Sequence, residues 1–117
     1  MEAYFRHRDE IAALLDPALY TIEWVDLQVA SGRVQAIGND RAVILVEIKE
    51  YPAGGLEVHG MAAAGDLDAI LPLIEQAENW GRSLGCVYGS IASREGWARV
   101  MAPHGYEVTQ VTIRKVL

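Results

Sequence analysis

The stretch that decides the fold reads Leu56-Glu57-Val58-His59-Gly60-Met61, then Ala62-Ala63-Ala64-Gly65 and Asp66. Its first part has the composition of a β-strand, and Asp66 stands at the expected N-cap of a long amphipathic helix. A strand that leads into a helix N-terminus forms an anion site, because the first backbone N–H groups of a helix lack intrahelical partners. Here Asp66 and Asp68 supply the negative charge themselves. The junction therefore combines the geometry of an anion site with carboxylates of its own.

The segment after this junction, residues 66–85, has the clearest helical pattern in the chain. Gly85 is a suitable C-terminal cap. Pro72 either kinks the helix or lies in the first turn of a helix that starts later. The inward stripe consists of Ile70, Leu73, Ile74, Ala77, Gly81 and Leu84. This pattern predicts a helix that packs one face on a sheet.

Three strands are predicted before this helix, and another follows it directly. Residues 34–37, 42–48 and 56–61 are apolar or alternating and are separated by turn residues, which predicts an antiparallel meander. Residues 86–92 follow the long helix, so this strand is predicted to run parallel to residues 56–61.

The two ends of the chain complete the predicted order. Helices are predicted at residues 9–15 and 22–31, and Ser93 is predicted to cap a short helix that contains Trp97. Residues 106–117 are predicted to form a long final strand. The order is α-α-β-β-β-α-β-α-β, an α/β fold with a mixed sheet, and the length of 117 residues predicts a single domain.

Composition excludes several classes of function. The net charge of −6 disfavours a surface that follows nucleic-acid phosphates, so no nucleic-acid partner is expected. No apolar run is long enough to cross a bilayer, so we expect a soluble, cytoplasmic protein with no membrane partner. Cys86 is the only cysteine, which excludes a disulfide within the chain. The three histidines lack metal-ligand spacing, so no metal site is predicted.

From about residue 34 to the end, the order of elements resembles the GNAT (GCN5-related N-acetyltransferase) fold. The resemblance is carried by the strand pair 42–61, the helix 66–85, the strand 86–92, the short helix around Trp97, and the turn His104-Gly105-Tyr106. The chain looks most similar to short GNAT-like proteins of tailed phages and prophages, in which helix-Gly-Cys-strand and Gly-Trp…Gly-Tyr patterns recur. The resemblance implies acetyl-CoA as the cofactor.

The loop that would hold acetyl-CoA departs from the family pattern. GNAT enzymes hold the pyrophosphate with an Arg/Gln-x-x-Gly-x-Gly/Ala loop, whose glycines let backbone N–H groups approach the phosphates. This chain has one glycine and an aspartate there, so the loop is degenerate. The resemblance assigns cofactor contacts to Met61, Ala62, Ala63 and Gly65. The tyrosine acid of the family has no match in residues 93–97.

Two side chains are candidates for acid–base chemistry. Glu57 and His59 alternate on one strand face, where GNAT enzymes often place a general base. The alternative is that both are polar residues on the solvent side of the strand. Glu47, in the preceding apolar strand, is either a functional acid or the point at which burial ends.

Two functions follow from these observations. The first is a non-catalytic or strongly diverged GNAT-fold accessory or virion-associated protein of phage or prophage type, located in the host cytoplasm or the virion. The alternative is a small acyl-CoA-dependent N-acetyltransferase that acts on an amine, with Glu57 or His59 as base. A protein partner or a homodimer is conceivable through the edge strands, residues 34–37 or 109–117.

Overall fold

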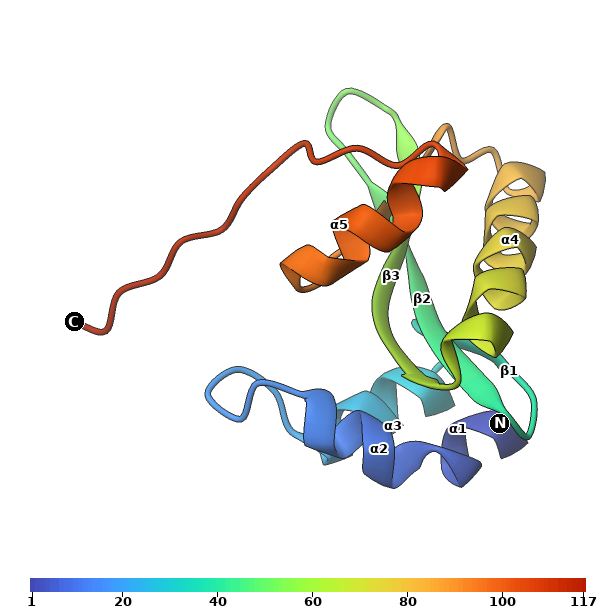
Figure 1. The fold of residues 1–117 in the computed structure, drawn as a ribbon, viewed down its shortest axis with the longest axis vertical. Helices are drawn as coiled ribbons and strands as arrows, with labels where there is room; N and C mark the ends of the chain where they lie inside the picture. The colour runs from blue at the N-terminus through green and yellow to red at the C-terminus, as the bar shows by residue number, and fades with distance from the viewer.

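The computed structural model describes residues 1–117 as a four-stranded mixed sheet with helices on both faces (Figure 1). The strands lie in the order β1-β2-β3-β4, with antiparallel β1–β2 and β2–β3 pairs and a parallel β3–β4 pair. The mixed α/β sheet predicted from the sequence is confirmed. The elements are α1 Glu2–Arg6, α2 Arg8–Leu14, α3 Ile22–Ala30, β1 Gln35–Gly38, β2 Ala42–Glu50, β3 Leu56–Gly65, α4 Leu67–Ser83, β4 Tyr88–Ile91, α5 Glu95–Met101 and a 3-10 turn at Ala102–His104.

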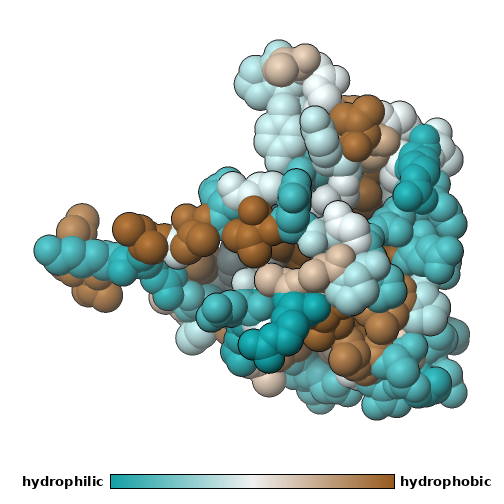
Figure 2. All heavy atoms as spheres, turned by 45° about the horizontal axis from the view of Figure 1, so that its top comes forward, coloured by the Kyte–Doolittle hydropathy of each residue, from teal (hydrophilic) through white to brown (hydrophobic).

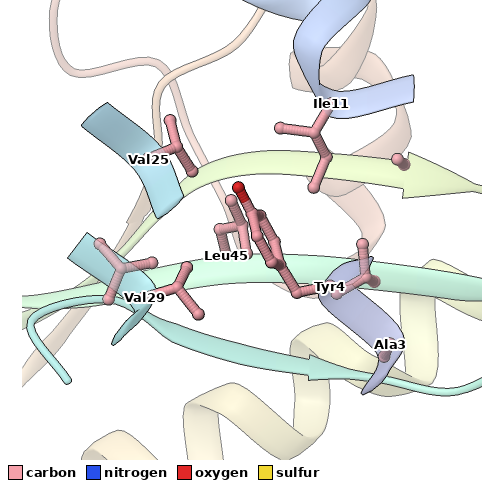
Figure 3. Packing of buried hydrophobic residues seen from close by; sticks show 9 residues of the cluster. Ala3, Tyr4, Ile11, Val25, Val29 and Leu45 are labelled. Atoms are coloured by element: carbon pink, nitrogen blue, oxygen red, sulfur yellow. The ribbon is translucent and has the colours of Figure 1, made fainter. Parts of the chain in front are cut away.

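Strand β2 is apolar on both faces because a helical layer covers each of them. Val43 and Leu45 face the first layer, formed by α1, α2 and α3, where Tyr4 packs beside Leu45 (Figure 3). Ile44 and Val46 face α4 and belong to a second buried cluster. A continuous apolar run is the expected pattern of a strand buried on both sides.

Strands β3 and β4 pair over a short distance and then diverge. The parallel pairing joins Glu57–Gly60 to Tyr88–Ile91, and beyond it β3 pairs only with β2. At this point the β2–β3 register shifts, because Leu45 pairs with Ala62 while Val46 pairs with Gly60. Met61 is therefore the extra residue of a β-bulge, and a bulge bends its strand and increases its twist.

The junction between β3 and α4 is tighter than the sequence predicts. The strand continues to Gly65, and only Asp66 precedes the helix. Gly65 has a φ of +108°, and a Cβ there would lie 2.2 Å from the carbonyl oxygen of Arg41. Pro72 lies inside α4, so the alternative of a later helix start is wrong.

The predicted helix at residues 9–15 is confirmed as α2, within one residue at each end. A further helix that was not predicted, α1, precedes it, and the two helices meet at His7. The buried ring of His7 contacts the carbonyl oxygen of Asn39, 3.3 Å away, and thereby ties this break to the β1–β2 turn. Ser93 does not cap α5: Arg94 occupies the N-cap, and the Ser93 hydroxyl donates to the Arg94 carbonyl oxygen.

The predicted final strand is wrong for this single chain. Residues 107–117 form no helix or strand and leave the body of the molecule as an extended arm (Figure 1). The physical reason is the absence of a neighbouring strand, since strand structure requires hydrogen bonds to a second strand. No helix is long and apolar enough to span a membrane.

Candidate functional site

An apolar cleft of about 290 Å³ opens where β3 and β4 diverge. Its walls come from the end of α2, the middle of β2 and β3, the inner face of α4, and the segment from β4 to α5. Ligand sites are typically concave and mostly apolar, with a few polar groups that orient the ligand. The cleft is open, although it lies at the small end of the usual range for ligand sites.

The residues predicted to contact a cofactor separate into two groups. Met61, Ala62 and Ala63 line the cleft. Gly65 does not line it and instead packs against the backbone of Arg41 and Ala42. The bulge at Met61 places the first group on the cleft, whereas the return to β2 pairing carries Gly65 away from it.

The N-terminus of α4 is occupied by carboxylates of the protein. Arg41, held in the β1–β2 turn, donates to Asp68 at 2.8 Å and to Asp66 at 3.4 Å. The Arg41 hydrogen bond is the main cause that lowers the pKa of Asp68, and the backbone N–H groups of Asp68 and Ala69 add to it. These residues do not fit a pyrophosphate, because the nearby cation Arg41 is already paired with two carboxylates whose negative charge would repel the phosphates.

The cleft rim carries one exposed cation. Arg94, the N-cap residue of α5, is exposed and lines the cleft. It is the only lysine or arginine among the lining residues. Any anionic part of a ligand in the cleft would therefore pair with Arg94.

His59 and Ser90 form a polar pair at the edge of the cleft. The Nδ1 atom of His59 lies 2.7 Å from the Ser90 hydroxyl, and Ser90 lines the cleft. Burial, followed by the positive charge of Lys49, lowers the pKa of the His59 imidazole, while Glu47 and Glu57 oppose this shift. A neutral imidazole carries one acceptor nitrogen, so His59 can accept a proton near neutral pH.

Glu57 lies on the same strand face but has a different role in the structure. It pairs across the sheet with Lys49, and the Tyr51 hydroxyl donates to it at 2.6 Å. Neither predicted base lines the cleft. His59 contacts Ser90, which does line it, whereas Glu57 is held by Tyr51 at the β2–β3 turn.

Glu47 marks the point at which burial of β2 ends. It pairs across the sheet with His59 and lies 3.9 Å from Lys49. Its side chain is partly exposed, so the strand changes here from an apolar core to a polar surface cluster.

Sequence reasoning missed two residues of this site. Ser90 could have been found from the parallel register, which sets it opposite His59. Tyr106 also lines the cleft, where its hydroxyl donates to Glu78 at 2.7 Å. Burial, and then the contact with Glu78, raises the pKa of Tyr106, so this phenol stays protonated.

Comparison with solved structures identifies the architecture. An acetyltransferase from Trypanosoma brucei superposes with a TM-score of 0.72 at 14% identity, covering 99% of this chain and 94% of that one. A GCN5-related N-acetyltransferase from Ralstonia eutropha JMP134 superposes with a TM-score of 0.68 at 18% identity, covering 98% and 86%. The chain has the GNAT fold. Neither a protein-family model nor a curated protein sequence matches it.

A third solved structure shares this architecture. A predicted acetyltransferase from Clostridium acetobutylicum, solved with acetyl-CoA, superposes with a TM-score of 0.66 at 10% identity, covering 97% of this chain and 86% of that one. At such low identity the likeness concerns the fold.

Proposed function

We propose that the chain is a small acyl-CoA-dependent N-acyltransferase that acts on an amine. The observation that carries the proposal is the open apolar cleft at the divergence of β3 and β4, which Ser90 lines and which His59 reaches through its contact with Ser90. The GNAT fold supports the reaction class, and the site residues supply a base.

The cleft suits one part of the donor better than the other. Met61, Ala62 and Ala63 would hold the pantetheine arm along β3, where small and apolar side chains leave the arm room. When bound, the thioester supplies an activated carbonyl group. The protein offers no phosphate-binding loop to the nucleotide end of the donor, because Asp66 and Asp68 lie at the N-terminus of α4.

His59 and Ser90 perform the proton chemistry in this proposal. His59 accepts the proton that the amine nitrogen loses as its bond to the carbonyl carbon forms, either directly or through the Ser90 hydroxyl. Burial favours the neutral imidazole, which keeps the base available near neutral pH. Tyr106, which also lines the cleft and stays protonated, is a neutral donor for the leaving thiolate.

The proposal is tested by calorimetry with acetyl-CoA and by thiol release with a panel of primary amines. We expect binding at millimolar or lower acetyl-CoA, and a loss of kcat of about a hundredfold or more in His59→Gln with binding unchanged. The matched control is His104→Gln, since His104 is exposed and lies outside the cleft. Absence of binding at millimolar acetyl-CoA would overturn the proposal.

A non-catalytic binding role is the second candidate, and one observation favours it. The carboxylates at α4 would repel the phosphates of acetyl-CoA at the place where the fold normally holds them. A chain that binds neither acetyl-CoA nor acetyl-pantetheine would favour this second role.

A further inference from the structure

A row of three polar side chains crosses the sheet on one of its faces. Glu47 of β2 pairs with His59 of β3 in the antiparallel register, and His59 pairs with Ser90 of β4 in the parallel register. Directly paired residues of neighbouring strands point to the same face of a sheet. The row therefore holds a carboxylate, an imidazole and a hydroxyl in the order in which a nucleophilic triad uses them.

The contact between Ser90 and His59 has the geometry of a nucleophile and its base. The Ser90 hydroxyl oxygen lies 2.7 Å from Nδ1 of His59, which is within the range typical of such pairs. When the neutral ring carries its proton on Nε2, the Ser90 hydroxyl donates to Nδ1. Ser90 also lines the cleft. Its hydroxyl therefore contacts the base and borders the space that a substrate would occupy.

No other side chain of the cleft lining combines these properties. The Ser93 hydroxyl donates to the carbonyl oxygen of Arg94, and the Tyr106 hydroxyl donates to Glu78. The lining contains no cysteine and no lysine. Ser90 is therefore the one nucleophile of the cleft that has a base in contact with it.

The charges around His59 suit a base that becomes protonated during a reaction. Burial and the positive charge of Lys49 lower the pKa of His59, while the charges of Glu47 and Glu57 raise it. The net shift is downward, so the neutral ring is available near neutral pH to accept the Ser90 proton. Once the ring is protonated, the carboxylate of Glu47 stabilises it. Glu47 thus acts through His59 and not on the substrate.

We propose that Ser90 is a nucleophile and that the chain cleaves esters and thioesters of short apolar acids through an acyl-Ser90 intermediate. The Ser90 oxygen bonds to the carbonyl carbon while its proton passes to Nδ1 of His59. The bond from this carbon to the leaving oxygen or sulfur then breaks, and His59 gives the proton to the leaving group. A water molecule next attacks the acyl group and gives a proton to His59. The carboxylic acid leaves as His59 returns that proton to the Ser90 oxygen.

The cleft determines the class of substrate. Its volume of about 290 Å³ and its mostly apolar lining suit a short apolar acyl group. Figure 2 shows that apolar surface also reaches the exterior near the middle of the face in view, beside hydrophilic side chains. Met61 lines the cleft and is the extra residue of the β-bulge, which is left out of the strand ladder. We assign the oxyanion of the reaction to its backbone N–H group.

The inference does not rest on the proposed function. In that function His59 takes a proton from an amine, and Ser90 forms no bond to the substrate. Acylation of Ser90 requires only an activated ester or thioester, so it can be measured without acetyl-CoA and without an amine.

Reaction of the full chain with p-nitrophenyl acetate tests the inference. We expect a burst of about one equivalent of p-nitrophenolate, and we expect peptide mass spectrometry to place an acetyl group on Ser90. Ser90→Ala should lose the burst, with a fall in hydrolysis rate of about a hundredfold or more. The matched control is Ser83→Ala, because the Ser83 hydroxyl also makes one hydrogen bond, to the carbonyl oxygen of Trp80, but is exposed and lies outside the cleft. It should keep the burst.

Two further variants test the roles of the neighbours of Ser90. His59→Gln should lose the burst while circular dichroism shows an unchanged fold. Glu47→Gln should slow acylation and move the midpoint of its pH profile to lower pH, because it removes a charge that raises the pKa of His59. A midpoint that does not move would contradict the role of Glu47.

The inference and the proposed function fail in different ways. An acetyl group found only on other residues, or a full burst in Ser90→Ala, would overturn the inference. Amine acetylation that persists in Ser90→Ala, with no acetyl-Ser90 in the wild type, would also overturn it and leave the proposed function intact. Acetyl-Ser90 in a chain that does not bind acetyl-CoA would support the inference and overturn the proposed function.

Discussion

At the scale of single residues, His59 shows how position changes the chemistry of a side chain. Alternation along β3 places it on the polar face of the sheet, and the parallel register sets Ser90 opposite it. Burial and Lys49 then favour the neutral imidazole, against the opposing charges of Glu47 and Glu57. The same residue type at position 104 is exposed and acquires none of these contacts.

This difference predicts a pH-dependent contribution to stability. The folded state lowers the pKa of His59, so the unfolded chain takes up a proton at a higher pH than the folded chain does. Between about pH 7 and pH 5, which brackets the ordinary histidine pKa, the free energy of unfolding should fall more steeply in the wild type than in His59→Gln. Urea titrations across this range measure the slopes. Equal slopes for the wild type and His59→Gln would contradict the prediction.

At the scale of elements, the contact of α4 with β3 depends on a glycine. A Cβ at Gly81 would lie 2.8 Å from Cγ1 and 2.9 Å from Cβ of Val58. Helix and strand therefore approach more closely than a side chain permits.

Two glycine-to-alanine substitutions should change the free energy of unfolding in opposite directions. Gly81→Ala should lower the free energy of unfolding by about 1–3 kcal/mol, because overpacking outweighs the gain in helix propensity. Gly96→Ala in α5 meets nothing within 4 Å and should raise it by up to about 1 kcal/mol. Urea denaturation of both variants checks the signs, and a stabilised Gly81→Ala would show that α4 can move off the sheet.

The start of α4 is the second element whose chemistry can be tested. Asp66→Asn/Asp68→Asn should free Arg41 and the helix N-terminus for an anion, and should tighten acetyl-CoA binding by about tenfold, as expected from removing charge repulsion near a phosphate. Calorimetry measures the change. Asp9→Asn/Glu23→Gln alters the net charge equally on distant helices and is the control. Equal effects of both pairs would indicate a general charge effect.

At the scale of the whole molecule, charge and cleft composition together predict the choice of donor. The chain has a net charge of −6, and its cleft is mostly apolar with one cation at the rim. Most of the donor affinity should therefore come from the acyl-pantetheine part.

Acetyl-pantetheine should accordingly replace acetyl-CoA with a loss of kcat/KM of no more than about tenfold, since few contacts to the nucleotide are available. Thiol-release rates with the two donors and the same amine measure this ratio. A loss of a thousandfold or more would reveal a phosphate site that the apolar cleft does not account for.

The sequence by itself determined the order of elements from residue 34 to about residue 105 and the direction of the β3–β4 pair. These features follow from local periodicity and from the length of α4, and both are properties of the local sequence. The paired carboxylates at the start of α4 were also readable, because charge is a property of the residues themselves.

Only the tertiary structure decided which candidates meet. It brought His59 to Ser90, separated Gly65 from Met61, and set Tyr106 on the cleft wall, because register and a one-residue bulge determine the face on which each side chain lies. It also left residues 107–117 unpaired, although their composition predicts a strand. Strand propensity is local, whereas a strand exists only where another backbone completes its hydrogen bonds.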